Sequence, residues 1–154
     1  MPIVIGPQAR HPLLWATWFD VSVPRLLKRL KPDLFLSQDG YLPLRSNVPS
    51  YCVIHDINFY HRPNDLPFFT RTYFNLMFPM YAKKATRLGT VSAYSKKDIA
   101  HCYQVEEDKI DILYNGANET YAPISTNEQE NVRAQLTDGK PYSFLLAPFC
   151  QEKM

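Results

Sequence analysis

The chain has 154 residues, 45% of them hydrophobic and 21% charged, which is the composition of a globular protein with one sizeable core. Its formal net charge of +2 is too small to indicate nucleic acid as a partner. The three cysteines form neither a CxxC pair nor an even disulfide framework, and no apolar run reaches the roughly 20 residues of a membrane-spanning helix, so we expect a cytoplasmic protein.

Short apolar runs that predict β-strands alternate with helical patterns along the chain. The expected strands are "PIVIG" (2–6), "DLFLS" (33–37), "YCVIHD" (51–56), "RLGTVS" (87–92), "IDILYNG" (110–116) and "YSFLLA" (142–147). The expected helices cover 13–31, 67–85, 95–103 and 126–136, and Pro24 should kink or divide the first. Strands that are apolar throughout and joined by helices predict an α/β fold, with a doubly wound parallel sheet covered on both faces.

Polar side chains stand at the carboxyl ends of three of these strands. They are Ser37, His55 with Asp56, and Ser92. Ligands of open parallel sheets bind at this edge. The run "SKKD" at 95–98 also predicts a helix start, with Ser95 as N-cap and Asp98 reaching back, and its free amides would suit an anion. Side chains of these types also satisfy loop backbone, so a ligand site and an ordinary strand end both stay open here.

Other chemistries find little support in the sequence. The His55-Asp56 pair ends a strand, and the remaining histidines show no helical ligand spacing to it, so we expect no metal site. The chain contains no G-x-S-x-G nucleophile turn, no phosphate-binding loop and no dinucleotide fingerprint.

The segment from 66 to 85 is apolar on nearly all sides of its predicted helix. Such a helix is normally buried in a core. The alternative is a helix at a membrane surface, where Lys83, Lys84 and Arg87 would meet anionic headgroups.

Three segments, taken in order, resemble family 4 of the GT-B glycosyltransferases. They are "IHDINFYHRPNDLP", "FPMYAKKATRLGTVSAYSKKDIAHCYQVEEDKIDILYNGAN" and "PYSFLLA". The specific elements are the strand ending in His-Asp, the "AKKATR" run before the "TVSAYSKKDI" turn, and the "EEDKIDILYNGAN" strand and exit. The likeness extends from about Ile3 to Ala147.

This resemblance implies two Rossmann-like domains that face each other across a cleft. The expected divisions are a partial N-terminal acceptor domain at 1–116, a connector at 117–141, and the first strand of an absent C-terminal donor domain at 142–154. It also implies transfer of a sugar from a nucleotide-sugar to a glycan or lipid-linked acceptor, with retention of configuration and without a metal or other cofactor. The location would be the cytoplasm, including the inner face of its membrane.

The resemblance also assigns roles to particular residues. His55 would be catalytic, Asp56, Ser37, Ser92 and Ser95 would line the acceptor cleft, and Lys153 would contact the donor diphosphate.

The final segment departs from the family pattern. In "LLAPFCQEKM", Ala147 replaces a glycine and Glu152 an arginine. With a donor domain absent, this predicts that the chain alone is inactive. The alternative is a non-catalytic remnant, or a module that binds an acceptor or a partner. Strands missing from the sheet would leave bare edges, which predict self-association.

Overall fold

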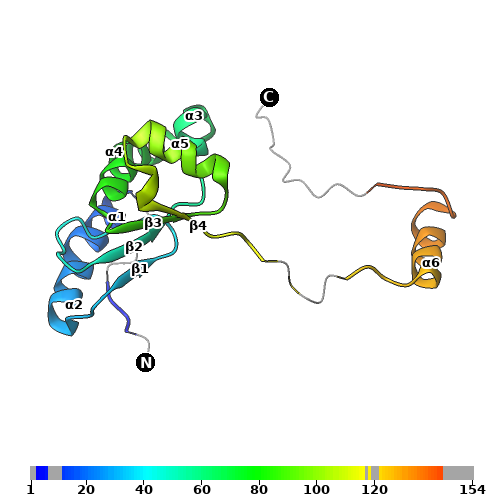
Figure 1. Cartoon of the computed structure of the whole chain (residues 1–154), viewed down its shortest axis with the longest axis horizontal. Coiled ribbons are helices and arrows are strands. Elements are labelled where there is room, and N and C mark those ends of the chain that lie inside the picture. Colours follow the sequence, from blue (N-terminus) through cyan, green and yellow to red (C-terminus); the bar gives the residue numbers. More distant parts are fainter. Residues whose placement is uncertain (1–2, 7–11, 117, 119–121, 144–154) are drawn as a thin grey trace. The chain divides into compact units, whose positions relative to one another are not determined.

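The computed structural model describes residues 3–6, 12–116, 118 and 122–143. The chain falls into two compact units, Met1–Asn115 and Gly116–Met154, which are described separately (Figure 1). None of the described helices has the length and hydrophobicity that crossing a bilayer requires.

A four-stranded parallel sheet forms the centre of the first unit, in the order β1-β2-β3-β4. Its strands are β1 (Phe35–Ser37), β2 (Ser50–Val53), β3 (Arg87–Thr90) and β4 (Ile110–Ile112). Consecutive strands are neighbours and run the same way. The parallel sheet and the α/β class are therefore as predicted, although each strand is shorter than its apolar run.

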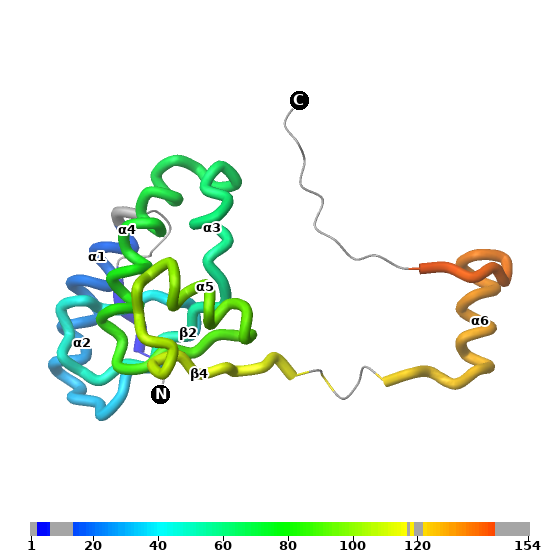
Figure 2. Tube along the Cα trace, turned by 45° about the horizontal axis from the view of Figure 1, so that its top comes forward, coloured from blue at the N-terminus to red at the C-terminus, as the bar shows by residue number. Residues whose placement is uncertain are grey.

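Helical crossovers join the last three strands. Figure 2 follows the chain from β2 through α3 (Asn58–His61) and back along α4 (Phe68–Lys84), with a 3₁₀ turn at Pro63–Asp65 between them. The crossover from β3 to β4 contains α5 (Ala93–Tyr103) and a second 3₁₀ turn at Glu107–Lys109. Right-handed crossovers that all step in one direction put their helices on one side of a sheet, where Figure 1 shows α4 and α5 together.

The hydrophobic core lies between these helices and the sheet. Inward residues of β2, β3 and β4, namely Cys52, Leu88 and Ile110, are at most 1% exposed. They belong to one cluster with residues of α4, α5 and the loops, which are Leu42, Ile54, Ile57, Phe78, Tyr81, Ala82, Ala85, Ile99 and Tyr103. This cluster fixes the sheet edge relative to the helices.

The opposite face of the sheet carries no described helix, so the expected cover on both faces is found on one face only within the described residues. Leu36 is 54% exposed and Leu113 is 42% exposed on that face. Tyr51 donates a hydrogen bond to Asp111 at 3.0 Å, and Arg87 pairs with the same carboxylate. Because the crossovers all step in one direction, none of them reaches this side.

The first predicted helix forms as one continuous helical run, made of α1 (Pro12–Thr17), a π-helical turn at Trp18–Ser22, and α2 (Val23–Leu30). The backbone at Ser22 and Val23 is α-helical, so Pro24 does not divide the run; the π-helical turn ends two residues before the proline, which has no N–H for a helical hydrogen bond. The strand expected at 2–6 is wrong for 3–6, which pair with no strand. Instead, the carbonyl oxygen of Gly6 accepts a hydrogen bond from Ser22 at 2.6 Å.

The second unit contains α6 (Thr126–Thr137), close to the helix predicted at 126–136. Ser125 and Glu128 form a capping box at its start. Of the strand expected at 142–147, residues 142 and 143 are not in a strand, and 144–147 lie outside the described residues, as does Lys153.

Candidate functional site

His55 lies directly beyond β2, at the carboxyl edge of the sheet. Its Nε2 is 3.0 Å from the carbonyl oxygen of Gln38, in the loop after β1, and its own carbonyl accepts a hydrogen bond from Thr90 of β3 at 3.2 Å. The imidazole is nevertheless exposed to solvent. A carbonyl can only accept, so Nε2 carries the hydrogen, and in the neutral ring Nδ1 is the acceptor. The strand end therefore holds an exposed imidazole in a defined orientation.

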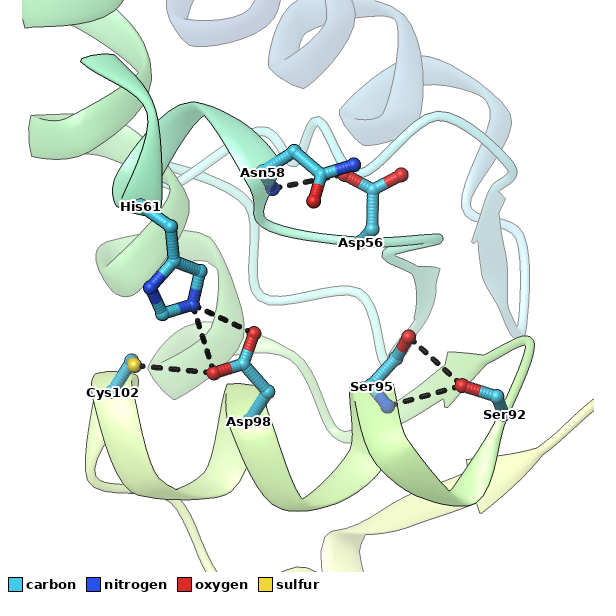
Figure 3. Close-up of polar contacts among 7 residues, drawn as sticks. All are labelled: Asp56, Asn58, His61, Ser92, Ser95, Asp98 and Cys102. Atoms are coloured by element: carbon cyan, nitrogen blue, oxygen red, sulfur yellow. Dashed lines mark hydrogen bonds and ion pairs between the residues drawn. The ribbon is translucent and has the colours of Figure 1, made fainter.

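Asp56 shapes the turn that follows. Its Oδ1 accepts a hydrogen bond from the backbone N–H of Asn58 at 2.9 Å, at the start of α3 (Figure 3). Between them, Ile57 is buried in the core. The carboxylate is exposed and lies beside a pocket of about 250 Å³ that Phe59, Arg62 and Phe74 help to line. Asp56 therefore fixes the turn after β2 and also lines a small open pocket.

Ser92, and not Ser95, caps α5. Its Oγ accepts the backbone N–H of Ser95 at 3.0 Å and donates to the Ser95 hydroxyl at 3.0 Å (Figure 3). The prediction of Ser95 as N-cap with Asp98 reaching back is wrong, because the backbone leaves its extended conformation at Ser92 and the helix begins one turn earlier. Ser95 is buried inside the first turn.

Ser37 ends β1 on the helix-covered side of the sheet. It is 8% exposed and pairs in register with Cys52. Burial raises the pKa of the Cys52 thiol to about 12, and a hydrogen bond with Ser37 partly offsets the rise. This hydroxyl has a partner within the core, and its role at a cleft stays a prediction.

A cluster that the sequence did not predict joins α3 to α5. Nε2 of His61 lies 2.9 Å from both carboxylate oxygens of Asp98, and the Cys102 thiol donates to Asp98 at 3.6 Å. Asp98 and Cys102 are four residues apart, so the sequence does place them on one face of a helix. Nothing local relates either of them to His61, which lies 37 residues before Asp98.

Comparison with known proteins identifies the family. The family model described as Glycosyltransferase Family 4 matches residues 2–121. The chain is also 30% identical over 124 residues to an O-antigen chain mannosyltransferase of Salmonella typhimurium, an alignment that covers 79% of this chain and 33% of the relative. The matched region thus spans about a third of the length of that curated relative. No solved structure matches the chain. Because the family model covers most of the sequence, this chain belongs to glycosyltransferase family 4.

Proposed function

We propose that this protein acts in the transfer of a sugar from a nucleotide-sugar to a glycan or lipid-linked acceptor, with retention of anomeric configuration. Family membership and the similarity to an O-antigen chain mannosyltransferase support glycosyl transfer. In this proposal, residues 1–116 supply the acceptor domain, 117–141 the connector, and 142–154 the beginning of a donor domain. The transfer step needs no metal ion.

The orientation of His55 carries this proposal. Retaining transfer develops positive charge on the sugar and negative charge on the departing diphosphate, and groups fixed before the reaction stabilise both charges best. The bond from Nε2 to the Gln38 carbonyl fixes the ring and leaves Nδ1 to accept a hydrogen bond from a sugar hydroxyl. No described residue is hydrogen-bonded to Nδ1. We assign to His55 the position beside the transferred sugar.

The neighbouring polar residues support that position in different ways. Asp56 fixes the turn after His55 through the backbone of Asn58. The hydroxyls of Ser92 and Ser95 are hydrogen-bonded to each other and shape the start of α5. The free amides in the first turn of a helix favour anionic groups. Lys153 as a contact of the diphosphate remains part of the proposal.

The exposed side of α4 suggests contact with a membrane surface. Its inner residues Phe78, Tyr81 and Ala82 are buried, as the core alternative predicted. Four other apolar side chains remain 46–69% exposed, which are Phe68, Phe69, Leu76 and Met80. Lys83 and Lys84 at the end of the helix are exposed and suit anionic headgroups, whereas Arg87 is paired with Asp111. We place the protein at the inner face of the cytoplasmic membrane, where a lipid-linked acceptor would lie.

The 154 residues alone should not catalyse transfer. Their match covers 33% of the mannosyltransferase, and the described residues contain one sheet, whereas the proposed transfer requires two domains that face each other. The proposal is therefore tested on this chain joined to the remaining C-terminal part of that mannosyltransferase.

The assay supplies a nucleotide-linked mannose and a lipid-linked O-antigen acceptor, and NMR of the product gives the anomeric configuration. We expect transfer with the donor's configuration retained, at a rate that added Mg²⁺ or Mn²⁺ does not raise. An inverted product would contradict the retaining mechanism. No transfer by the chimera, under conditions where the intact mannosyltransferase is active, would contradict the proposed function.

A further inference from the structure

Three potential metal ligands of different types converge between α3 and α5. They are His61 at the end of α3, with Asp98 and Cys102 one turn apart on α5 (Figure 3). One ligand atom of each lies within 4.8 Å of the other two. We propose that these residues form a binding site for a divalent transition-metal ion, and that Zn²⁺ fits it best.

One distance between the three groups agrees with tetrahedral coordination, and a shift of the His61 side chain would adjust the others. A zinc ion with bonds of about 2.0 Å to oxygen and nitrogen and about 2.3 Å to sulfur separates oxygen from sulfur by about 3.5 Å, and oxygen from nitrogen by about 3.3 Å. The Cys102 sulfur lies 3.6 Å from Asp98 Oδ1, which is close to the oxygen-to-sulfur separation in such a site. The His61 nitrogen lies 2.9 Å from the carboxylate, so the imidazole would draw back slightly. Its side chain is 44% exposed, so it has room to do so.

The chemistry of the three groups favours zinc over a hard cation. A thiolate and an imidazole bind Zn²⁺ well, whereas Mg²⁺ and Ca²⁺ prefer oxygen ligands alone. A thiolate and a carboxylate together balance the two positive charges of the ion. Three protein ligands leave the fourth position to water, on the side where His61 is exposed.

Two of the three proposed ligands lie on α5, a helix that is anchored in the hydrophobic core. Ile99 and Tyr103 of α5 are each 1% exposed and anchor the helix in the core, which holds Asp98 and Cys102 in place. His61 comes six residues after His55, so a bound ion would tie the segment that follows the His55-Asp56 turn to α5. The ion would stabilise this arrangement and would take no part in the transfer step.

A cobalt titration of the 154-residue chain tests the proposal. The chain carries Cys150→Ser, because Cys150 is a thiol outside the described residues, and Cys52 is buried and cannot compete. We expect one Co²⁺ per chain, with a thiolate-to-cobalt charge-transfer band and the visible bands of tetrahedral cobalt, all displaced by Zn²⁺. Zinc should also raise the midpoint of thermal unfolding.

Matched variants separate this site from adventitious binding. Cys102→Ser should abolish the charge-transfer band, and His61→Gln and Asp98→Asn should each weaken Zn²⁺ binding by about 10-fold or more. His101→Gln, which changes an exposed histidine on the same helix, should leave the affinity unchanged. Far-UV circular dichroism checks that each variant is folded, and any one folded ligand variant suffices. No cobalt–thiolate band in the parent, or unchanged affinity in a folded ligand variant, would overturn the proposal.

Discussion

The loop after β1 turns at Gly40, and replacing this glycine with alanine should strongly destabilise the first unit. Gly40 has a φ of +82°, which residues with a side chain rarely adopt. Forcing alanine into this region costs roughly 1–2 kcal/mol. A Cβ there would also lie 2.6 Å from Cε1 of Phe78, which is closer than atoms in contact can approach.

The Phe78 ring has little room to move away. It is 6% exposed and packs edge-on against Phe59 at a centroid distance of 4.9 Å. Overpacking of this kind costs about 1–3 kcal/mol. We therefore expect Gly40→Ala to lower the free energy of unfolding by about 2–5 kcal/mol, a large part of the roughly 5–15 kcal/mol that stabilises a domain.

Urea unfolding followed by circular dichroism measures this loss of stability. Two further variants show how much of it comes from the backbone conformation and how much from the contact with Phe78. Gly6→Ala is the matched control, because its Cβ would meet nothing within 4 Å and the change should stay within about 0.5 kcal/mol. In a Phe78→Leu background, Gly40→Ala should retain only the backbone cost of roughly 1–2 kcal/mol. A loss under about 0.5 kcal/mol for Gly40→Ala would refute the strain at this turn. An equally large loss in the Phe78→Leu background would show that the clash with Phe78 does not contribute.

Three further predictions concern surfaces of the fold. Arg87 and Tyr51 hold the pKa of Asp111 below its usual 3.8, so the pair stabilises the fold above that pH and the contribution disappears as pH falls through the lower folded pKa. Asp111→Asn should cost about 1 kcal/mol or less at neutral pH, and acid titration of the urea midpoint should show its difference from the parent closing below about pH 4; a constant difference would contradict this. The variant Phe68→Ser/Phe69→Ser should co-sediment less with anionic liposomes than the parent, with Leu136→Ser of α6 as the control, and a parent that does not bind at low salt would exclude the membrane surface. Among the described residues, β1 is an edge strand and one sheet face has no helix over it, so the isolated chain should self-associate in size-exclusion chromatography, whereas a monodisperse monomer with a sharp thermal transition would show that these surfaces are protected.

The features predicted from the sequence were those that depend on neighbouring residues. The helices α4 and α6, for example, follow from their local sequence patterns. The position of His55 at a strand end could also be predicted, because a polar pair interrupts an apolar run.

The errors concern features that depend on distant partners or on competing local ones. Residues 3–6 look like a strand, but a strand forms only where another strand can pair with it. Ser92 and Ser95 both precede a helical pattern, and only the backbone conformation shows which one caps α5. The contact of His61 with Asp98 depends on how α3 packs near α5, which no local pattern records.

The role of His55 is tested by one rate comparison in the chimera of this chain with the remaining C-terminal part of the mannosyltransferase. His55→Ala should lower the rate of sugar transfer by about 10²-fold or more, the effect of removing one group that stabilises the transition state. His101→Ala, which removes an exposed imidazole in the last turn of α5, should transfer at the parent rate. Circular dichroism and the urea midpoint should be unchanged in both variants. Equal rates for His55→Ala and His101→Ala, with both proteins folded, would contradict the proposed role of the sheet edge in transfer.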